Sequence, residues 1–267
     1  MIGHEGRGRV LILAGSDSGG GAGIQADIKT VTALGGYAAT AITAVTVQNT
    51  LGVSAVHPIP LDIIEGQARA VLDDIGADAI KTGMLGDEAV VELVARIIES
   101  AGDIPAVIDP VMVAKGGASL LDEGAVAAVR ERLIPLAALL TPNAPEAAAL
   151  TGLAVETEDD MRRAGEALLQ LGARAVLMKG GHVEGPVVVD LLMTPYAETR
   201  FETGRLDTRH THGTGCTLAS ACAVGLAQGL GLDRSVARAR DYVLEAIRRA
   251  PGFGAGHGPL DHGWPVR

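Results

Sequence analysis

Short apolar runs that alternate with longer amphipathic segments constrain the fold of this chain more strongly than any other feature. The runs are rich in alanine, valine, isoleucine and leucine, which suits strands buried on both faces. They occupy residues 10–14, 79–81, 106–109, 138–141 and 175–179. Helical periodicity predicts helices at residues 23–34, 61–74, 87–100, 122–133, 157–171, 214–228 and 233–250. This order predicts an α/β fold, with a mainly parallel central sheet and helices on both faces.

Two segments break this alternation. Residues 37–58 contain strand-like stretches at 41–48 and 53–57, which predict a small β lid or flap, and residues 187–204 resemble a hairpin. The sequence has no internal repeat and no long linker. We therefore expect a single domain over residues 1–267, with residues 1–8 as a flexible N-terminal tail.

Charge and composition exclude some classes of partner. The formal net charge is −10 and aromatic residues make up 2% of the chain, whereas nucleic acids bind basic surfaces and stack on aromatic rings. The N-terminus does not resemble a signal peptide, and no window reaches the roughly 18 to 20 apolar residues that span a bilayer. We expect a cytoplasmic protein that binds neither nucleic acid nor membranes.

Polar residues end several of the predicted strands or follow them closely. In open α/β sheets the ligand lies beyond the carboxyl ends of the strands, so Asp109, Thr141, Asn143 and Lys179 are candidate site residues. Lys179 could place its ammonium group on a nucleotide phosphate or lie in a solvated turn, and we favour the first. Asn143 and Glu146 could face a metal-bound phosphate or form a capping box at a helix start, and the sequence leaves both open.

A first glycine-rich segment, residues 14–27, runs from a predicted strand into a helix and suits a ligand-binding loop. It is not a P-loop, because no Gly-Lys-Ser/Thr follows. Residues 21–26 do fit a loose dinucleotide-binding pattern, which makes a dehydrogenase the main rival hypothesis. Against that rival, residues 46–49, about 20 positions further on, contain no carboxylate for a ribose hydroxyl.

A second glycine-rich turn, residues 211–216, also leads into a predicted helix. Its small residues allow several backbone N–H groups to converge on an anion, although a structural helix start explains the segment alone equally well. Cys216 favours the functional hypothesis, because we expect the helix dipole at this position to favour the thiolate and lower its pKa. Cys222 lies deeper in the helix and suggests inert packing, and His212 has no metal-ligand spacing and suggests a structural residue.

Taken in order, seven motifs resemble the bacterial hydroxymethylpyrimidine/phosphomethylpyrimidine kinases of thiamine biosynthesis. They occupy residues 14–27, 48–50, 81–85, 109–112, 141–147, 178–182 and 211–216, and residues 256–260 resemble the tail of that family. The resemblance covers nearly the whole chain. It implies a ribokinase-like fold, usually dimeric, that transfers the γ-phosphate of ATP with Mg²⁺ first to hydroxymethylpyrimidine and then to its monophosphate.

The resemblance also implies roles for individual residues. The aminopyrimidine would be hydrogen-bonded by Asp27 and Gln48, in a pocket lined by Ala22, Met84 and Val111. The nucleotide would lie against Lys179, Asn143, Thr214 and Asp109, with Glu146 on the metal. Gly213, Thr214 and Gly215 would hold the transferring phosphoryl group beside Cys216, which stands where the wider ribokinase group usually has aspartate.

Two alternatives remain open. Pyridoxal/pyridoxine kinases form a related group, since some share this fold and the cysteine. Thr46 supports keeping this alternative, because it stands at a pocket position that is often apolar in the hydroxymethylpyrimidine kinases. A pure ligand-binding module would bind the pyrimidine without turnover.

Overall fold

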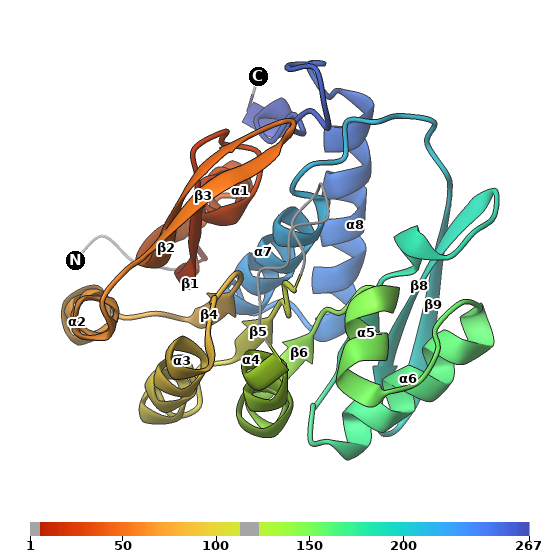
Figure 1. The fold of residues 1–267 in the computed structure, drawn as a ribbon. Coiled ribbons are helices and arrows are strands. Elements are labelled where there is room, and N and C mark those ends of the chain that lie inside the picture. The colour runs from red at the N-terminus through yellow and green to blue at the C-terminus, as the bar shows by residue number, and fades with distance from the viewer. Residues whose placement is uncertain (1–5, 113–122, 267) are drawn as a thin grey trace.

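The computed structural model describes residues 6–112 and 123–266 of the chain. Within this range one nine-stranded sheet has the order β3-β2-β1-β4-β5-β6-β7-β8-β9 (Figure 1). The six strands from β2 to β7 in this order pair in parallel, which confirms the predicted α/β class. The strands are β1 Arg9–Asp17, β2 Tyr37–Asn49, β3 Gly52–Pro58, β4 Ala79–Thr82, β5 Ala106–Ile108, β6 Ala137–Leu140, β7 Val176–Met178, β8 Val187–Thr194 and β9 Ala197–Gly204.

Helices cover both faces of the sheet, because successive strand residues point to opposite sides. Val10 and Ile12 of β1 pack in a core with α1, α7 and α8, whereas Leu11 and Leu13 pack in a second core with α2 to α6. The helices are α1 Gly23–Ala33, α2 Leu61–Ala70, α3 Glu88–Ser100, α4 Glu123–Ala128, α5 Ala144–Thr151, α6 Glu158–Gln170, α7 Thr214–Ala227 and α8 Leu232–Arg248. Short helical segments also occur at Val71–Ile75, Val129–Leu133, Ile134–Leu136, Gly180–His182 and Trp264–Val266.

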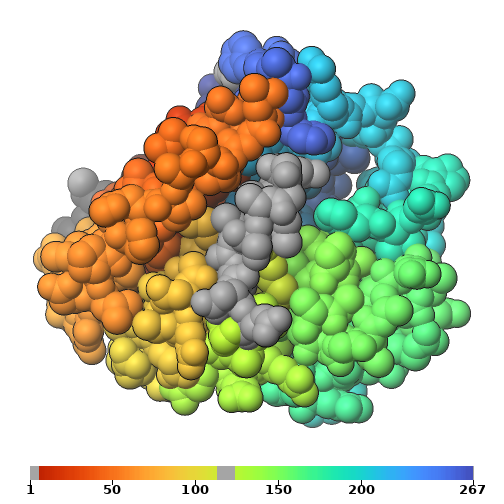
Figure 2. Space-filling view, viewed as in Figure 1, coloured from red at the N-terminus to blue at the C-terminus, as the bar shows by residue number. Residues whose placement is uncertain are grey.

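Both irregular segments of the sequence are antiparallel hairpins, which confirms the hairpin predicted at residues 187–204 and the strands predicted within residues 37–58. Strands β2 and β3 form one, with β3 at the edge of the sheet, and β8 and β9 form the other at the opposite edge. Figure 2 shows β2 and β3 as a continuous orange ridge on the surface of the molecule. That this ridge moves as a lid stays a prediction.

The predicted helix positions agree with the structure except for α5. This helix is eight residues long and has no clear apolar stripe, so periodicity does not reveal it. Its capping box, formed by Asn143 and Glu146, confirms one of the two readings of that motif. A second capping box, formed by Thr157 and Asp160, holds the start of α6.

The two ends of the chain have different surroundings. Of the predicted flexible tail, residues 1–8, the first five lie outside the described residues. At its end, the carbonyl group of Gly8 accepts a hydrogen bond from the backbone N–H of Tyr37. Near the other end, His257 donates its backbone N–H to Thr50 in the β2–β3 turn, and Gly258 accepts from the backbone of His212. Across the described ranges, we find no helix with the length and hydropathy needed to cross a bilayer.

Candidate active site

A large cleft lies at the carboxyl ends of the parallel strands and has a volume of about 1210 Å³. Both glycine-rich turns contribute to its walls, as the sequence predicted for a ligand site. The predicted site residues that line this cleft are Ala22, Gln48, Met84, Asp109, Val111, Asn143, Glu146, Lys179, Gly213, Thr214, Gly215 and Cys216. Asp27 and Thr141 do not line it, because both are fully buried behind its wall.

The two glycine-rich turns touch at the N-terminus of α7. Gly213 caps this helix with a φ of +83°, a left-handed conformation that favours glycine. A β-carbon at Gly213 would lie 1.8 Å from the carbonyl oxygen of Gly21, so no larger residue fits. The first-turn amides of a helix have no carbonyl partner within it, and here they border the cleft. This geometry would allow the turn to hold an anion.

Lys179 brings a positive charge to the same place. Its ammonium nitrogen lies 3.0 Å from Oδ1 of Asp109 and 3.7 Å from Oε2 of Glu146. A β-carbon at Gly215 would lie 3.3 Å from that nitrogen, so the amide turn and the ammonium group are neighbours. Burial alone would lower the pKa of Lys179, but the charges of Asp109 and Glu146 outweigh it and hold the pKa above its ordinary value. Lys179 is therefore a permanent cation.

Asn143 and Glu146 cap α5 and at the same time border the cleft. The backbone N–H of Asn143 donates to Oε2 of Glu146 at 2.8 Å, and the N–H of Glu146 donates to the side chain of Asn143 at 2.9 Å. Burial raises the pKa of Glu146 to about 7, against the opposing charge of Lys179. The capping box and a role at the phosphates are thus compatible, because the cap fixes the carboxylate beside Lys179.

The carboxylates suit a magnesium ion that arrives with a nucleotide. The residue ranges 6–112 and 123–266 contain no group of three or more His, Cys, Asp or Glu side chains that could hold a metal ion. Mg²⁺ commonly binds through one or two carboxylates together with substrate phosphates and water. Oδ2 of Asp109 is buried and has no hydrogen-bond partner among the described residues, so it is an available oxygen. Asp109 and Glu146 therefore fit such an ion.

Another part of the cleft is organised around Gln48. Its side-chain oxygen lies 3.1 Å from Oγ1 of Thr46, and its side-chain nitrogen lies 3.4 Å from Nε2 of His212. His212 in turn lies 2.9 Å from Oδ2 of Asp17, whose carboxylate also accepts the backbone N–H groups of the first glycine-rich turn. The amide of Gln48 is therefore held in place at the cleft wall. The sequence predicted Gln48 but not its support by Asp17 and His212.

Apolar groups flank this amide. Met84 closes over Gly15, where a β-carbon would lie 2.5 Å from its terminal methyl group. Met84, Val111 and Ala22 are each partly exposed to the cleft. The three predicted apolar residues thus line the same cleft as Gln48, and the flexible side chain of Met84 can adapt to a ligand there.

Asp27 lies behind the cleft rather than on its wall. It is fully buried, and both of its carboxylate oxygens lie 3.0 Å from the ammonium nitrogen of Lys81. Ser220 donates to the same carboxylate at 2.6 Å. In this geometry Asp27 offers no free oxygen to a ligand, whereas Lys81, at the floor of the cleft, lies in front of it. The sequence gave no sign of this ion pair.

Cys216 lies in the first turn of α7 and is half-buried. The expectation that the helix dipole lowers its pKa is wrong for this structure. Burial raises the pKa of Cys216 to about 12, because it penalises the thiolate more than the charge of Lys81 and the N–H of Gly23 favour it. Cys222 is fully buried in the core, as predicted.

A third part of the cleft was not predicted from the sequence. Its apolar walls come from β8, the segment after β9, and α8, and consist of Val188, Leu206, Val243, Leu244 and Ile247. Beside them Arg240 donates to Asp190 at 2.8 Å, and Asp190 accepts the backbone N–H of Gly180 at 2.9 Å. These residues have no motif, because they meet only when the second hairpin packs near α8.

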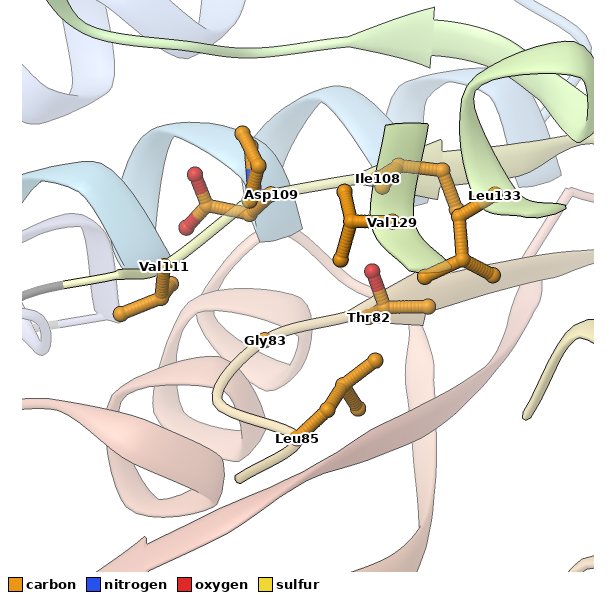
Figure 3. Close-up of a pocket in the computed structure, with 9 residues that line it drawn as sticks. Thr82, Gly83, Leu85, Ile108, Asp109, Val111, Val129 and Leu133 are labelled. Carbon is orange, nitrogen blue, oxygen red and sulfur yellow. The ribbon is translucent and has the colours of Figure 1, made fainter. Parts of the chain in front are cut away.

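A second, much smaller cavity lies behind Asp109, between β4, β5 and the segment Val129–Leu133 (Figure 3). Its volume is about 10 Å³, which is close to the lower limit for one water molecule. Thr82 lines it, and the buried hydroxyl of Thr82 has no hydrogen-bond partner among the described residues. This cavity is too small for an organic ligand, so the large cleft is the candidate active site.

Comparison with known proteins identifies the family. The family model for phosphomethylpyrimidine kinase matches residues 17–261. The chain belongs to the phosphomethylpyrimidine kinase family. The hydroxymethylpyrimidine/phosphomethylpyrimidine kinase of Streptomyces coelicolor is 51% identical over 257 residues, which cover 96% of this chain and 95% of that protein.

A second relative is longer than this chain. The thiamine biosynthesis bifunctional protein of Geobacter sulfurreducens is 52% identical over 257 residues, which cover 96% of this chain but 52% of that protein. The chain thus spans about half of that relative and nearly the whole of the Streptomyces kinase.

Solved structures of kinases share the fold. A Bacillus subtilis pyridoxal kinase in complex with ADP has a TM-score of 0.90 and 38% identity, with 96% of this chain and 97% of that chain covered. A phosphomethylpyrimidine kinase from Clostridium difficile has a TM-score of 0.81 and 41% identity, with 90% and 100% covered. These comparisons confirm the predicted ribokinase-like fold. They also confirm that this member of the phosphomethylpyrimidine kinase family is a phosphotransferase.

Proposed function

We propose that this chain is an ATP-dependent kinase that phosphorylates 4-amino-5-hydroxymethyl-2-methylpyrimidine and then its monophosphate, in thiamine biosynthesis. One observation carries the proposal. Lys179, Gly215 and Cys216 meet at the N-terminus of α7, within the cleft that also holds Gln48. An anion-binding turn, a cation and a proton acceptor thus share one cleft with an amide that can pair with an aminopyrimidine.

In the first reaction the hydroxyl oxygen of the pyrimidine attacks the γ-phosphorus, and the bond from that phosphorus to ADP breaks. The amides of Gly213, Thr214 and Gly215, together with Lys179, stabilise the charge on the transferring group. Cys216 takes the hydroxyl proton, for which it must first release its own proton to solvent. In the second reaction the attacking phosphate oxygen is already largely ionised, so proton transfer to Cys216 is hardly needed.

The proposed nucleotide site extends from this anion-binding turn to the apolar part of the cleft. The side chains of Val188, Val243 and Ile247 suit a purine base, and Asn143 and Asp109 lie on the phosphate side. Mg²⁺, held by Glu146 and Asp109 together with the phosphates, would neutralise charge on the nucleotide. Complexes of a Staphylococcus aureus pyridoxal kinase with ADP and with AMP-PCP support nucleotide binding in this fold.

The proposed substrate pocket is formed by Gln48, Met84, Val111 and Ala22. The amide of Gln48 can pair with donor and acceptor edges of an aminopyrimidine. We propose that Asp27 contributes through Lys81 rather than by direct contact, since its oxygens already accept from Lys81 and Ser220.

Pyridoxal kinase activity is the second candidate. It is supported by the similarity to the Bacillus subtilis pyridoxal kinase, which at a TM-score of 0.90 exceeds the 0.81 for the Clostridium difficile phosphomethylpyrimidine kinase. The polar hydroxyl of Thr46 behind Gln48 would also tolerate a pyridine ring.

A coupled assay of ADP release, with hydroxymethylpyrimidine, its monophosphate and pyridoxal side by side, tests the proposal. We expect turnover of both pyrimidines with a higher kcat/KM than that for pyridoxal. A preference for pyridoxal would support the second candidate, and binding of pyrimidine without ADP release would support a ligand-binding module.

We also propose that the chain forms a homodimer in the cytoplasm. The β2–β3 hairpin lies at the sheet edge and on the surface of the molecule (Figure 2). It carries exposed apolar side chains, among them Tyr37, Val45, Val47 and Val56. Such an apolar surface beside an open sheet edge suits contact with a second copy. Sedimentation equilibrium should give a dimer mass, and Val47→Asp should shift it towards the monomer. A monomeric wild-type protein would contradict this proposal.

A further inference from the structure

The reaction as described so far does not say how the buried ion pair of Lys81 and Asp27 contributes to it. Lys81 belongs to β4, Asp27 to α1, and neither side chain has any exposed surface. A buried pair of charges costs desolvation energy and seldom stabilises a fold more than apolar residues would. Its position at the floor of the active-site cleft therefore suggests a function.

The geometry places this pair directly beneath Cys216. Ser220, which donates to Asp27, follows Cys216 by four residues on α7, so the two side chains lie on the same face of that helix. Asp27 in turn follows Gly23 by four residues on α1, and the backbone N–H of Gly23 donates to the sulfur of Cys216. Two helices thus align the ion pair one turn below the thiol.

Lys81 reaches the same space from the sheet. Its neighbour Ile80 packs in the core with α2 to α6, so alternation along β4 directs Lys81 to the face that α1 and α7 cover. A β-carbon at Gly83, on the cleft wall, would lie 3.0 Å from the ammonium nitrogen of Lys81. Lys81 has three N–H donors, and the contacts with Asp27 leave at least one of them for another partner.

We propose that Lys81 and Asp27 together set how readily Cys216 exists as a thiolate. Lys81 supplies the positive charge that stabilises the thiolate. Asp27, fixed by Ser220, holds Lys81 in place and opposes part of that effect. Both are positioning residues, since they act through Cys216. The inference rests on the proposed function in one respect, namely that Cys216 accepts a proton from the substrate.

The other charges around Cys216 do not replace this pair. Asp109, at the end of β5, disfavours the thiolate in the same sense as Asp27, and Lys179, at the end of β7, is already paired with Asp109 and Glu146. Burial raises the pKa of Cys216 to about 12, and among the nearby charges Lys81 opposes this most strongly. The thiolate therefore depends mainly on Lys81.

Alkylation of Cys216 by iodoacetamide tests the inference without nucleotide or pyrimidine. Cys216 and Cys222 are the two cysteines of the chain, so a Cys222→Ala background reports on Cys216. At a fixed, mildly alkaline pH, alkylation should be about threefold or more slower in Lys81→Met. A rise of one pKa unit lowers the thiolate fraction about tenfold, and the higher nucleophilicity of the more basic thiolate offsets part of that loss. It should be faster in Asp27→Asn. The exposed charge removed by Arg69→Met should have no effect.

The double variant Lys81→Met/Asp27→Asn removes both charges and avoids the unpaired charge that could prevent Lys81→Met from folding. Its thiol should react more slowly than that of the parent. Opposite changes in the two single variants support the inference, because a merely loosened structure would speed alkylation in both. Equal rates in all variants, or acceleration in both single variants, would overturn it.

A kinetic measurement separates this inference from the proposed function. In Lys81→Met, phosphorylation of the alcohol should slow more than phosphorylation of the monophosphate. If alkylation changes as expected while the ratio of the two steps does not, the control of the thiol by Lys81 and Asp27 stands, and the role of Cys216 as proton acceptor fails.

Discussion

The ammonium nitrogen of Lys179 lies 3.0 Å from Oδ1 of Asp109, which joins the ends of β7 and β5. Thr141, at the end of the intervening strand β6, donates to the same oxygen at 3.1 Å. Three neighbouring strand ends are therefore tied together at one point, where the first turn of α7 also arrives. This arrangement fixes a cation where the proposed phosphoryl transfer takes place.

Replacing Lys179 by methionine should lower kcat/KM for ATP by about 10²- to 10³-fold, the typical effect of losing one group that stabilises transition-state charge. Steady-state kinetics with hydroxymethylpyrimidine measures this. Lys29→Met removes an exposed lysine of α1 and serves as the matched control, with little expected change. Near-normal kinetics in Lys179→Met would mean that this ammonium group does not contact the nucleotide.

Gly213→Ala should abolish most activity, because the new methyl group would meet the carbonyl oxygen of Gly21 and displace the start of α7. Gly229 has a similar φ of +78° but open space around it, so Gly229→Ala isolates the backbone strain. That control should lose about 1 kcal/mol of stability and keep its kcat. Equal kcat values in the two variants would show that the turn at Gly213 is not needed for phosphoryl transfer.

Gln48→Ala should raise the KM for hydroxymethylpyrimidine about tenfold or more and leave the KM for ATP nearly unchanged, since a lost hydrogen bond to a buried ligand is worth about 1 to 2 kcal/mol. The exposed Gln170→Ala, at the end of α6, is the control. An unchanged KM for the pyrimidine in Gln48→Ala would remove this residue from the substrate site.

Glu146 should make the stability of the ligand-free protein depend on pH. Its pKa is raised from 4.5 to about 7, so the folded state holds this proton more tightly than the unfolded state. The resulting stability is fully present below about pH 4.5 and is lost as the pH rises through about 7. Denaturant titrations should show a fall of at least about 1 kcal/mol in the free energy of unfolding between these limits, and the fall should be smaller in Glu146→Gln. The same pH profile in both proteins would refute this pKa shift.

The sequence predicted those parts of the site that depend on local chemistry. Lys179 and Asp109 could be found because each ends or follows a buried strand, and the turn before Cys216 because its small residues open a helix. The two readings of Asn143 and Glu146 do not exclude each other, since the capping box is formed and both residues also border the cleft. A role at a metal-bound phosphate stays a prediction.

Long-range pairing explains what the sequence did not reveal. Asp27 is 54 residues from Lys81 and 193 residues from Ser220 in the sequence. No local pattern therefore indicates that Lys81 and Ser220 donate to the carboxylate of Asp27. The predicted direction of the pKa shift at Cys216 was wrong for the same reason. The helix dipole can be read from the sequence, whereas burial of the thiol among α1, β4 and α7 cannot.

The most direct test of the central claim compares Cys216→Ala with the wild type in both phosphorylation steps. A positioned base contributes about 10²- to 10⁴-fold when an alcohol must lose a proton, and much less when the attacking oxygen is already ionised. The account predicts that Cys216→Ala slows phosphorylation of hydroxymethylpyrimidine at least about tenfold more than phosphorylation of its monophosphate. Equal losses in the two steps would contradict it.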